Sequence, residues 1–433
     1  MAEITPFPAR SETPTLAEVP AKPQQVLVDK LPSLPEIAWR PLFTQYGDLM
    51  GPTTEAADEH HYMAFMAYTG AMLGRRVYTV MGDRIYPNLY VAIVGASSQA
   101  RKTTVLNKAH DLFCSRAPSK PLLDEKTVVS GISSAEGLLE HIDRAPQDGD
   151  THPMLVKLQE LAQLFAKARN SSTDLLLPML NDLYDCPDIK HLPTRGGTAL
   201  AVVKPTLSIV SVSTREALTA RLEAEDIWGG FINRIMFGLG QRKGPMPLPP
   251  LADEAGMAAL CAKLEKIKDR WPNGESAYIR VSGKALKQIW EPYYGIQYRR
   301  EHANPHVNVA LQRNPTHAMK VALIMAALEG ERQITVDILR AACATAEYFR
   351  QCAVSLLEGF GMSPVDRLIQ KICEVVQTKE CHTKADVQKW ARVRKPGGGF
   401  YGADVFNEAW ATVWRAETLA TNRDTGALFV RSG

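Results

Sequence analysis

A short run of small and polar residues, from Gly95 to Thr104, holds the residue types that bind phosphate groups. It reads GASSQARKTT and follows the continuous apolar run 89–94, which predicts a buried strand. Small residues let backbone N–H groups curl around phosphate oxygens, a lysine can reach the β- and γ-phosphates, and a threonine hydroxyl can ligate Mg²⁺. The order of strand, loop and helix therefore predicts a site for ATP and Mg²⁺.

Within this run, Lys102 is the expected phosphate ligand and Thr103 the expected metal ligand. The remaining residues expected to contact the nucleotide are Gly95, Ser97, Ser98, Gln99, Ala100, Arg101 and Thr104. The run departs from the usual GxxxxGK(S/T) pattern, because its spacing is longer by one residue and Arg101 replaces the last glycine. Taken alone, it could also be a serine-rich turn before an unrelated helix, which we expect over 103–115.

A carboxylate follows a second apolar strand, predicted over 154–158. ATP hydrolysis needs a carboxylate that orients and deprotonates water, and we expect this strand beside the strand 89–94. Glu160 is the expected base, whereas the neutral Gln159 stands where an acid normally helps to hold Mg²⁺. Glu160 could alternatively be an acid in the first turn of a helix over 159–169, favoured there by the helix dipole.

Two arginines could stabilise charge in a transition state. Arg234 lies in the segment GGFINRIMF, where a small-residue turn and an apolar strand would fix it. It could reach the γ-phosphate bound by a neighbouring subunit, as an arginine finger does. Arg313 lies in a helical segment and could sense the nucleotide from there. Either side chain could instead be an ordinary surface or ion-pairing arginine.

Hydroxyl groups at the end of a third predicted strand, 207–212, could also take part. Ser211, Ser213 or Thr214 could hydrogen-bond the attacking water or the γ-phosphate. Thr214 also fits the N-cap of a helix over 214–222, which is the structural alternative.

The composition is that of an ordinary soluble protein. The chain has 433 residues, of which 45% are hydrophobic and 22% charged, and a formal net charge of +3. This charge allows a nucleic-acid partner without requiring one. The seven cysteines form no CxxC pair and no cluster with zinc spacing, which favours reduced thiols and a cytoplasmic location. No secretory signal and no run of about 18 apolar residues is present, so no membrane span is expected.

Proline-rich stretches and changes of periodicity divide the chain. The segment KGPMPLPPL (243–251) is one expected boundary, and alternation of strand and helix patterns before it predicts an α/β sheet. We expect a disordered tail over 1–38, a sheet core with leading helices over 39–250, a helical segment over 251–360 and a last segment over 361–433.

The last segment has the order of a winged helix-turn-helix. Helices are expected over 366–378, 383–391 and 402–414, followed by two short strands. Basic residues between the last two helices could hold a DNA backbone, namely Lys389, Arg392, Arg394 and Lys395. Asp404 and Glu408 on the third helix disfavour insertion into a groove, and winged helices also serve as protein-docking modules.

Taken together, these segments resemble a family of helicase-like ATPases encoded by phages, plasmids and integrated mobile elements, often linked to primases. The likeness covers about residues 40–433, and the family's phosphate loop often carries the same Arg-Lys pair. The matching stretches are GRRVYTV (74–80), NLYVAIVGASSQARKTT (88–104), 159–185, KPTLSIVSVSTREAL (204–218), GGFINRIMF (229–237) and 311–353.

This resemblance implies an AAA+-type P-loop core followed by an α-helical lid and a C-terminal winged helix, related to superfamily 3 and minichromosome-maintenance helicases. Those proteins form hexameric rings with ATP between subunits, which implies that Glu160 is the base and that Arg234 acts in trans. The hairpin expected over 189–204 would then project into the pore. Its candidate contacts to DNA phosphates are Lys190, His191, Arg195 and Lys204.

The expected function is that of an ATP-dependent DNA helicase or translocase in the replication of a mobile element or phage, and the resemblance implies a separate primase as a partner. The alternative is a DNA-binding ATPase switch, regulatory or defensive, that assembles with ATP and unwinds nothing. Gln159 favours this alternative, since it would weaken metal binding. A degenerate scaffold that binds no ATP is the third possibility.

Overall fold

The centre of the protein is a five-stranded sheet in which all strands run parallel, in the order β4-β5-β8-β3-β9. Its strands are β3 (Tyr90–Val94), β4 (Val128–Ser130), β5 (His152–Leu158), β8 (Pro205–Ser213) and β9 (Ile235–Leu239). The structure is a computed structural model, and it describes residues 31–96, 100–116, 121–169, 175–192, 200–271, 276–393, 399–422 and 425–430. The predicted α/β class is confirmed.

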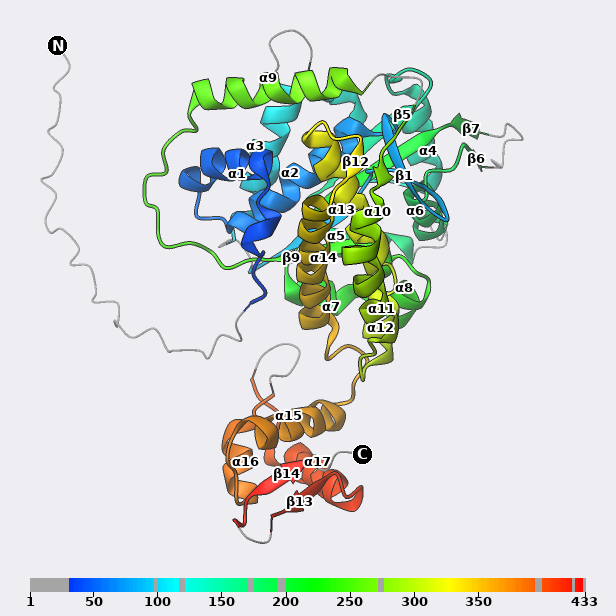
Figure 1. The fold of residues 1–433 in the computed structure, drawn as a ribbon. Helices are drawn as coiled ribbons and strands as arrows, with labels where there is room; N and C mark the ends of the chain where they lie inside the picture. The colour runs from blue at the N-terminus through cyan, green and yellow to red at the C-terminus, as the bar shows by residue number, and fades with distance from the viewer. Residues whose placement is uncertain are drawn as a thin grey trace, which may run out of the picture. The chain divides into compact units, whose positions relative to one another are not determined.

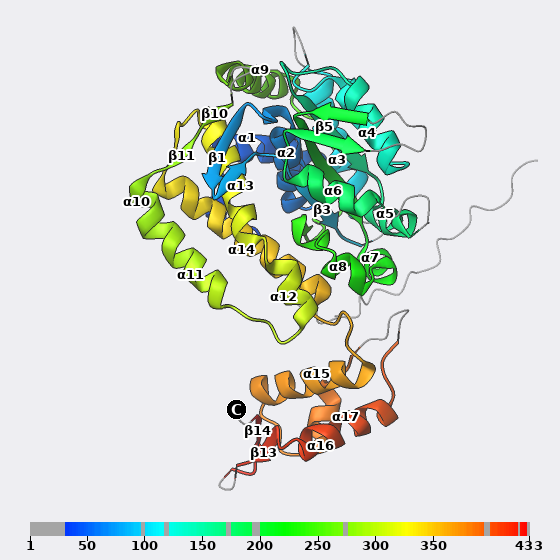
Figure 2. The ribbon, with the colours of Figure 1, turned by 90° about the vertical axis from the view of Figure 1, so that its right-hand side faces the viewer.

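Helices cover both faces of this sheet (Figures 1 and 2). The helices that contact β8 are α2 (Asp58–Leu73), α3 (Lys102–Cys114), α5 (Leu161–Ala168) and α6 (Leu176–Tyr184). All nine residues of β8 are therefore buried, as expected for a parallel strand with helices on both sides. In α2, every residue from His60 to Leu73 is buried.

The expectation that the strand ending at Leu158 lies beside β3 is wrong, because β8 lies between β5 and β3. The pairing is continuous, with Met154 opposite Leu207 on one side of β8 and Tyr90 opposite Ile209 on the other. β8 is apolar along its whole length and suits the centre of the sheet, whereas β5 carries the half-buried Lys157. An apolar run in the sequence indicates a buried strand but does not specify its neighbours.

The predicted hairpin is confirmed in its two strands, β6 (Ile189–Leu192) and β7 (Leu200–Val203), which pair antiparallel with Ile189 opposite Val203. These strands lie at the edge of the main body, near α6 and β1 (Figure 1). The tip, 193–199, and with it Arg195, lies outside the described residues.

The expected tail, 1–38, is wrong in its last residues. Leu34 and Ala38 are buried, and the short 3₁₀ helix η1 (Glu36–Ala38) packs against α14 (Val336–Leu357). Residues 1–30 lie outside the described part of the chain. The elements that follow are α1 (Pro41–Met50), η2 (Gly51–Thr53), and the strands β1 (Val77–Met81) and β2 (Asp83–Ile85).

The helical segment predicted after residue 250 is present and packs on the sheet. It consists of α9 (Glu254–Arg270), α10 (Gly283–Ala285), a π-helical turn (Leu286–Trp290), α11 (Glu291–Arg299), α12 (Pro305–Leu311), α13 (Asn314–Leu328) and α14. α14 contacts β9, and β10 (Ala277–Tyr278) extends the small sheet of β1 and β2. Shorter elements are η3 (Glu125–Thr127), α4 (Ala135–Arg144), α7 (Arg215–Arg221), α8 (Ala224–Trp228), η4 (Ile232–Arg234), β11 (Arg280–Val281) and β12 (Gln333–Ile334).

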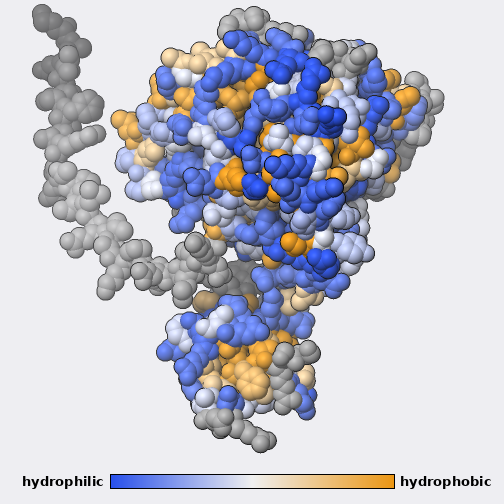
Figure 3. Space-filling model, viewed as in Figure 1, coloured by the Kyte–Doolittle hydropathy of each residue, from blue (hydrophilic) through white to orange (hydrophobic). Residues whose placement is uncertain are grey.

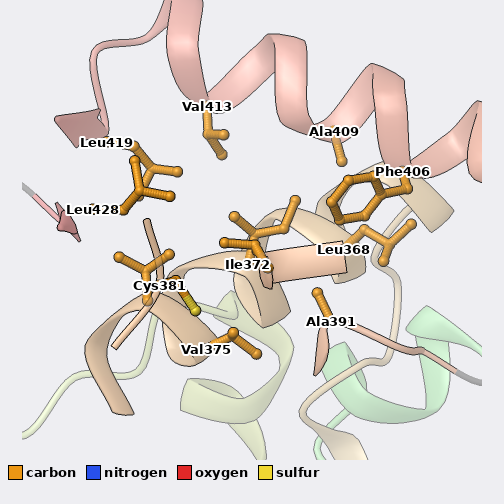
Figure 4. Packing of buried hydrophobic residues seen from close by; sticks show 12 residues of the cluster. Leu368, Ile372, Val375, Cys381, Ala391, Phe406, Ala409, Val413, Leu419 and Leu428 are labelled. Carbon is orange, nitrogen blue, oxygen red and sulfur yellow. The ribbon is translucent and has the colours of Figure 1, made fainter. Parts of the chain in front are cut away.

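The last segment has three helices and an antiparallel pair of strands, as predicted. These are α15 (Pro364–Thr378), α16 (Lys384–Trp390), α17 (Ala403–Arg415), β13 (Leu419–Thr421) and β14 (Leu428–Val430). Capping boxes, in which Ser363 and Thr383 exchange bonds with Asp366 and Asp386, begin α15 and α16. Figure 4 shows the apolar cluster that these elements share, around Ile372 and other buried side chains.

The visible surface is mixed in character. Figure 3 shows hydrophilic side chains over much of the main body and an apolar area on the last segment. Large apolar side chains of this segment that stay exposed include Trp390, Phe400 and Phe429. In the described parts of the chain, no helix combines the length and the apolar character needed to cross a membrane.

Candidate functional site

The loop 95–101 leaves the carboxyl end of β3 at the point where the order of the sheet reverses. The Gly95 backbone N–H donates to the Ser213 carbonyl (3.2 Å) and ties the loop to the end of β8. After β3, the next strand of the sheet is β4, at one edge. After β8, the next strand of the sheet is β9, at the opposite edge. In open α/β sheets, ligands bind in the crevice at such a reversal. Ser97, Ser98 and Gln99 lie outside the described residues.

The N-terminus of α3 faces this crevice with no side-chain cap. The N-cap residue is Arg101, which takes a left-handed conformation (φ 48°) in the place of the usual glycine. Thr103 and Thr104 are exposed in the first turn. The first N–H groups of a helix lack partners within the helix, and the dipole of a 13-residue helix favours an anion at this end.

The Lys102 side chain lies over its own loop. Its ammonium donates to the carbonyls of Gly95 and Ala96, both at 2.8 Å. Burial lowers the pKa of Lys102, while the nearby carboxylates of Glu160 and Glu216 raise it. A phosphate oxygen would be a stronger acceptor than either carbonyl, because it carries a negative charge that attracts the ammonium and the carbonyls are neutral.

Glu160 stands at the end of β5, where its carboxylate joins two elements. Its Oε1 caps α5 by accepting from the Ala162 N–H (3.2 Å) and also accepts from the Ser213 hydroxyl. Glu160 is therefore the N-cap of α5 and precedes the first turn in which the alternative placed it, and it lies close enough to Lys102 to influence the pKa of that lysine. Since both bonds use Oε1, Oε2 can accept from a further donor such as water.

The three hydroxyls expected near this site have different partners, and the Ser211 hydroxyl does not reach the crevice. Ser211 lies two residues inside β8, where its hydroxyl donates to the Val91 carbonyl of β3 (2.9 Å). Ser213, at the end of the strand, holds Glu160 instead. Thr214 caps α7 by accepting from the Ala217 N–H (3.0 Å), as the structural alternative predicted. Ser211 and Ser213 lie two residues apart and point to the same face of β8, so their depth along the strand decides which hydroxyl reaches the crevice.

Glu55 is a residue of this region that the sequence did not reveal. Its buried carboxylate binds Arg101 (Nε to Oε2, 3.4 Å) and Arg242, and it accepts from the Met246 N–H (2.8 Å). These contacts hold the loop against the segment that follows β9. Its position before α2 carries no motif, so only the fold connects it with the loop.

The two predicted arginines, Arg234 and Arg313, share one carboxylate but do not lie near Lys102. Asp185, which follows α6, binds Arg234 (3.0 Å) and Arg313 (2.9 Å). Arg234 directly precedes β9, whose first residue pairs with Tyr90 at the start of β3. The arginines therefore lie at the amino ends of the strands, about 15 Å from the loop at ~3.3 Å per strand residue. Within one chain they cannot reach a phosphate at Lys102.

The candidate DNA contacts differ in their surroundings. Lys190 is paired with Asp182 and Lys204 with Asp150, whereas His191 is exposed. In the last segment Lys389 and Arg392 are exposed, and the Lys389 ammonium lies 5.5 Å from the ring centre of Trp390. Arg394 and Lys395 lie outside the described residues.

A cavity of about 280 Å³ adjoins Glu160 on the side of β4. Lys157, Gln159 and Gly131 are among its lining residues, so an exposed amide rather than a second acid lies next to Glu160. Among the described residues, no group of three or more His, Cys, Asp or Glu side chains could hold a metal ion by itself. Neither a scan of protein families nor a search of curated proteins found a match to this chain.

Proposed function

We propose that this protein hydrolyses ATP at a P-loop formed by residues 95–104. The observation that carries the proposal is the convergence of four features on one crevice: the uncapped end of α3, Lys102, Glu160 and Ser213. The close packing of Gly95 adds support, since a Cβ there would come within 2.9 Å of the Ala100 Cβ. This combination suits a triphosphate, which needs backbone donors at close range and one cation.

The residues present fit Mg²⁺–ATP. Lys102 and the first N–H groups of α3 would hold the phosphates, and the exposed Thr103 hydroxyl would ligate Mg²⁺. The metal supplies charge that stabilises the departing phosphate oxygens. Glu160 would orient the attacking water and accept its proton, and Ser213 would fix the position of that carboxylate.

We further propose that active sites form between copies of this chain, in a ring that the family resemblance suggests is hexameric. Arg234 and Arg313 lie about 15 Å along the strands from their own loop at ~3.3 Å per residue, so a second copy must present them. An arginine finger acting across an interface stabilises the charge of the transferring phosphoryl group. Such head-to-tail interfaces close into rings.

The motor function proposed is that of a DNA helicase or translocase in replication of a mobile element or phage, with a separate primase as its proposed partner. Support comes from the β6–β7 hairpin, which carries Lys190 and His191 on β6 and is joined through Lys204 to β8, a strand of the sheet that holds the site. Further support comes from the order of elements in residues 364–430, which suits a winged helix with Lys389 and Arg392 exposed on it.

The second candidate is a DNA-binding switch that assembles with ATP without unwinding DNA. The exposed amide of Gln159 beside Glu160 favours it, because a second acid there would help to hold Mg²⁺. Slow turnover would suit a switch better than a motor.

The test is ATPase activity of the purified chain with and without single-stranded DNA. We expect stimulation by DNA and loss of activity in Lys102→Ala and Glu160→Gln, with ATP binding lost only in Lys102→Ala. Lys108→Ala is the matched control, because Lys108 lies on the same helix and is also partly buried. An ATPase rate that is the same with and without DNA would support the switch. A protein that binds no ATP would contradict the proposal of ATP hydrolysis.

A further inference from the structure

Two arginines share one carboxylate at the amino ends of the strands. Asp185 Oδ1 binds Arg313 Nη1 (2.9 Å) and Oδ2 binds Arg234 Nη2 (3.0 Å). Both guanidinium groups also lie over the ring of Tyr184, at 5.8 Å for Arg234 and 5.6 Å for Arg313. Arg234 is largely buried and Asp185 half-exposed, so the carboxylate is the more accessible member of the pair.

The same spot holds further positive charge. The buried Lys320 ammonium lies 4.4 Å from the centre of the Tyr184 ring and donates to the Asn88 side chain (2.6 Å). Three cationic groups thus surround Tyr184, while Asp185 supplies the carboxylate that offsets part of their charge. An incoming phosphate would compete with Asp185 for Arg234 and Arg313, because both anions accept paired hydrogen bonds from guanidinium groups.

Asp185 is also attached to the base of the β6–β7 hairpin. The next residue, Cys186, and the residue after β7, Lys204, both have positive φ values (52° and 46°). The Lys204 N–H donates to the Asp188 carbonyl (2.7 Å) and closes the hairpin between these two points. Both ends of the hairpin are therefore held in backbone conformations that residues other than glycine rarely adopt.

Arg75, almost fully buried, fastens this base to the main body. It donates to the Pro187 carbonyl (2.6 Å) and to Asp188 (3.0 Å) on the outgoing side. On the returning side it donates to the Thr206 hydroxyl (3.3 Å). Since Arg75 holds both sides, the segment 185–188 is a short rigid link between the arginine pair and the hairpin.

We infer that Asp185 is a positioning residue that couples a phosphate in the neighbouring subunit to the DNA-contacting hairpin. Without that phosphate, Asp185 holds Arg234 and Arg313 away from the neighbour. When the arginines turn to the phosphate, Asp185 loses both partners, and the link 185–188 transmits the change to β6. DNA on the hairpin then favours the released state, by the reciprocity that governs coupled sites. This inference rests on the proposed function.

The first experiment measures ATPase rates of the full chain with and without oligo(dT), for wild type, Asp185→Asn and Asp185→Glu. Asp185→Asn should raise the DNA-free rate at least threefold and bring the ratio of stimulated to basal rate close to one. Asp185→Glu keeps the charge and should retain most of the stimulation. Asp337→Asn is the matched control, since it removes an exposed acid paired with Arg340 on α14.

The second experiment measures hydrogen exchange of the hairpin amides in the same proteins without nucleotide. Asp185→Asn should speed exchange in β6 and β7 at least threefold and leave β8 unchanged. If wild type hydrolyses ATP and Asp185→Asn keeps the wild-type stimulation ratio, the coupling through Asp185 is contradicted but the proposed function is not. Unaltered hydrogen exchange of the hairpin in Asp185→Asn would have the same meaning. A wild type without ATPase activity would overturn the proposed function and this inference together.

Discussion

The two ends of the central sheet hold their cations in different ways. At the carboxyl end, Lys102 binds two backbone carbonyls, and among the described residues no carboxylate lies within ion-pair distance of it. At the amino end, Arg234 and Arg313 are paired with Asp185, and Arg75 with Asp188. Lys102 can accept a polyphosphate without breaking an ion pair, whereas Arg234 and Arg313 must exchange the Asp185 carboxylate for it. We interpret the first as a binding site and the second as a switchable contact.

The largest expected effect separates the two ends directly. Arg234→Ala should lower kcat for ATP by at least about 10³-fold, the usual contribution of an arginine finger. The affinity for ATP should change little, because Arg234 lies at the far end of the strands from its own loop. The measurement is steady-state hydrolysis together with binding of a fluorescent ATP analogue. If Arg234→Ala also lost nucleotide binding, the two ends would not be separate in function.

Ser213→Ala tests how firmly the carboxyl end positions its carboxylate. A hydrogen bond to a charged group contributes about 1.5–3 kcal/mol, so kcat should fall between about 10-fold and 100-fold. Ser211→Ala is the matched control on the same strand, because its hydroxyl bonds only within the sheet. A larger kinetic loss in Ser211→Ala than in Ser213→Ala would contradict this assignment of the site.

Low pH should reduce the free energy of unfolding, because a buried histidine lies near each end of the central sheet. Burial lowers the pKa of His60, under the loop, to about 4 and that of His317, near Arg313, to about 3. The unfolded chain binds these protons near pH 6.5 and the folded chain does not, so stability is lost as the pH falls below that value. Each histidine should lower the free energy of unfolding by about 2 kcal/mol between pH 7 and pH 5.

The measurement is urea unfolding of wild type and His317→Gln at the two pH values. The variant has no proton to gain, so its loss of stability should be smaller by about 2 kcal/mol. His191→Gln, on the exposed face of β6, should behave as wild type. Equal losses in wild type and His317→Gln would show that His317 is not held neutral by burial.

The smallest effect concerns the residue that replaces the usual loop glycine. A left-handed conformation costs a residue with a side chain roughly 1–2 kcal/mol, and the long contact between the exposed Arg101 side chain and the buried Glu55 carboxylate returns at most about 1 kcal/mol. Arg101→Gly should therefore raise the unfolding free energy by between about 0 and 2 kcal/mol. Arg101→Ala should be about 1 kcal/mol less stable than Arg101→Gly. Thermal unfolding of both variants compares them, and a more stable alanine variant would contradict this explanation.

Much of the fold follows from local patterns in the sequence. The buried strands β3, β5 and β8 have mostly apolar sequences, and several helices of residues 251–360 begin at capping residues such as Asp253, Asn304 and Thr335. The positions of Gly95 and Glu160 just after buried strands were also predictable from the apolar runs before them, and their roles at a phosphate loop stay predictions.

Other features depend on long-range packing and could not be predicted. The position of β8 between β3 and β5 follows from how whole strands share the interior, which no local pattern encodes. Glu55 and Asp185 act through arginines 46 and more residues away in sequence, and neither belongs to a motif. The sequence does not show whether Ser211 or Ser213 lies in the crevice, because it does not show where β8 ends. The structure ends β8 at Ser213, which places the Ser213 hydroxyl there.

The most direct test of the account mixes two inactive proteins, Lys102→Ala and Arg234→Ala. If active sites form between subunits, a subunit of the Arg234→Ala variant supplies an intact phosphate loop. A neighbouring subunit of the Lys102→Ala variant can then supply the intact Arg234. Random mixing of equal amounts places these two together at about a quarter of the interfaces, so the mixture should regain a comparable share of wild-type ATPase activity. Mixing Lys102→Ala with Glu160→Gln is the control. It should restore no ATPase activity, because Lys102 and Glu160 must act in the same subunit and neither variant has both. No recovery in the first mixture, with normal assembly, would contradict the proposal that the two ends of the sheet meet across an interface.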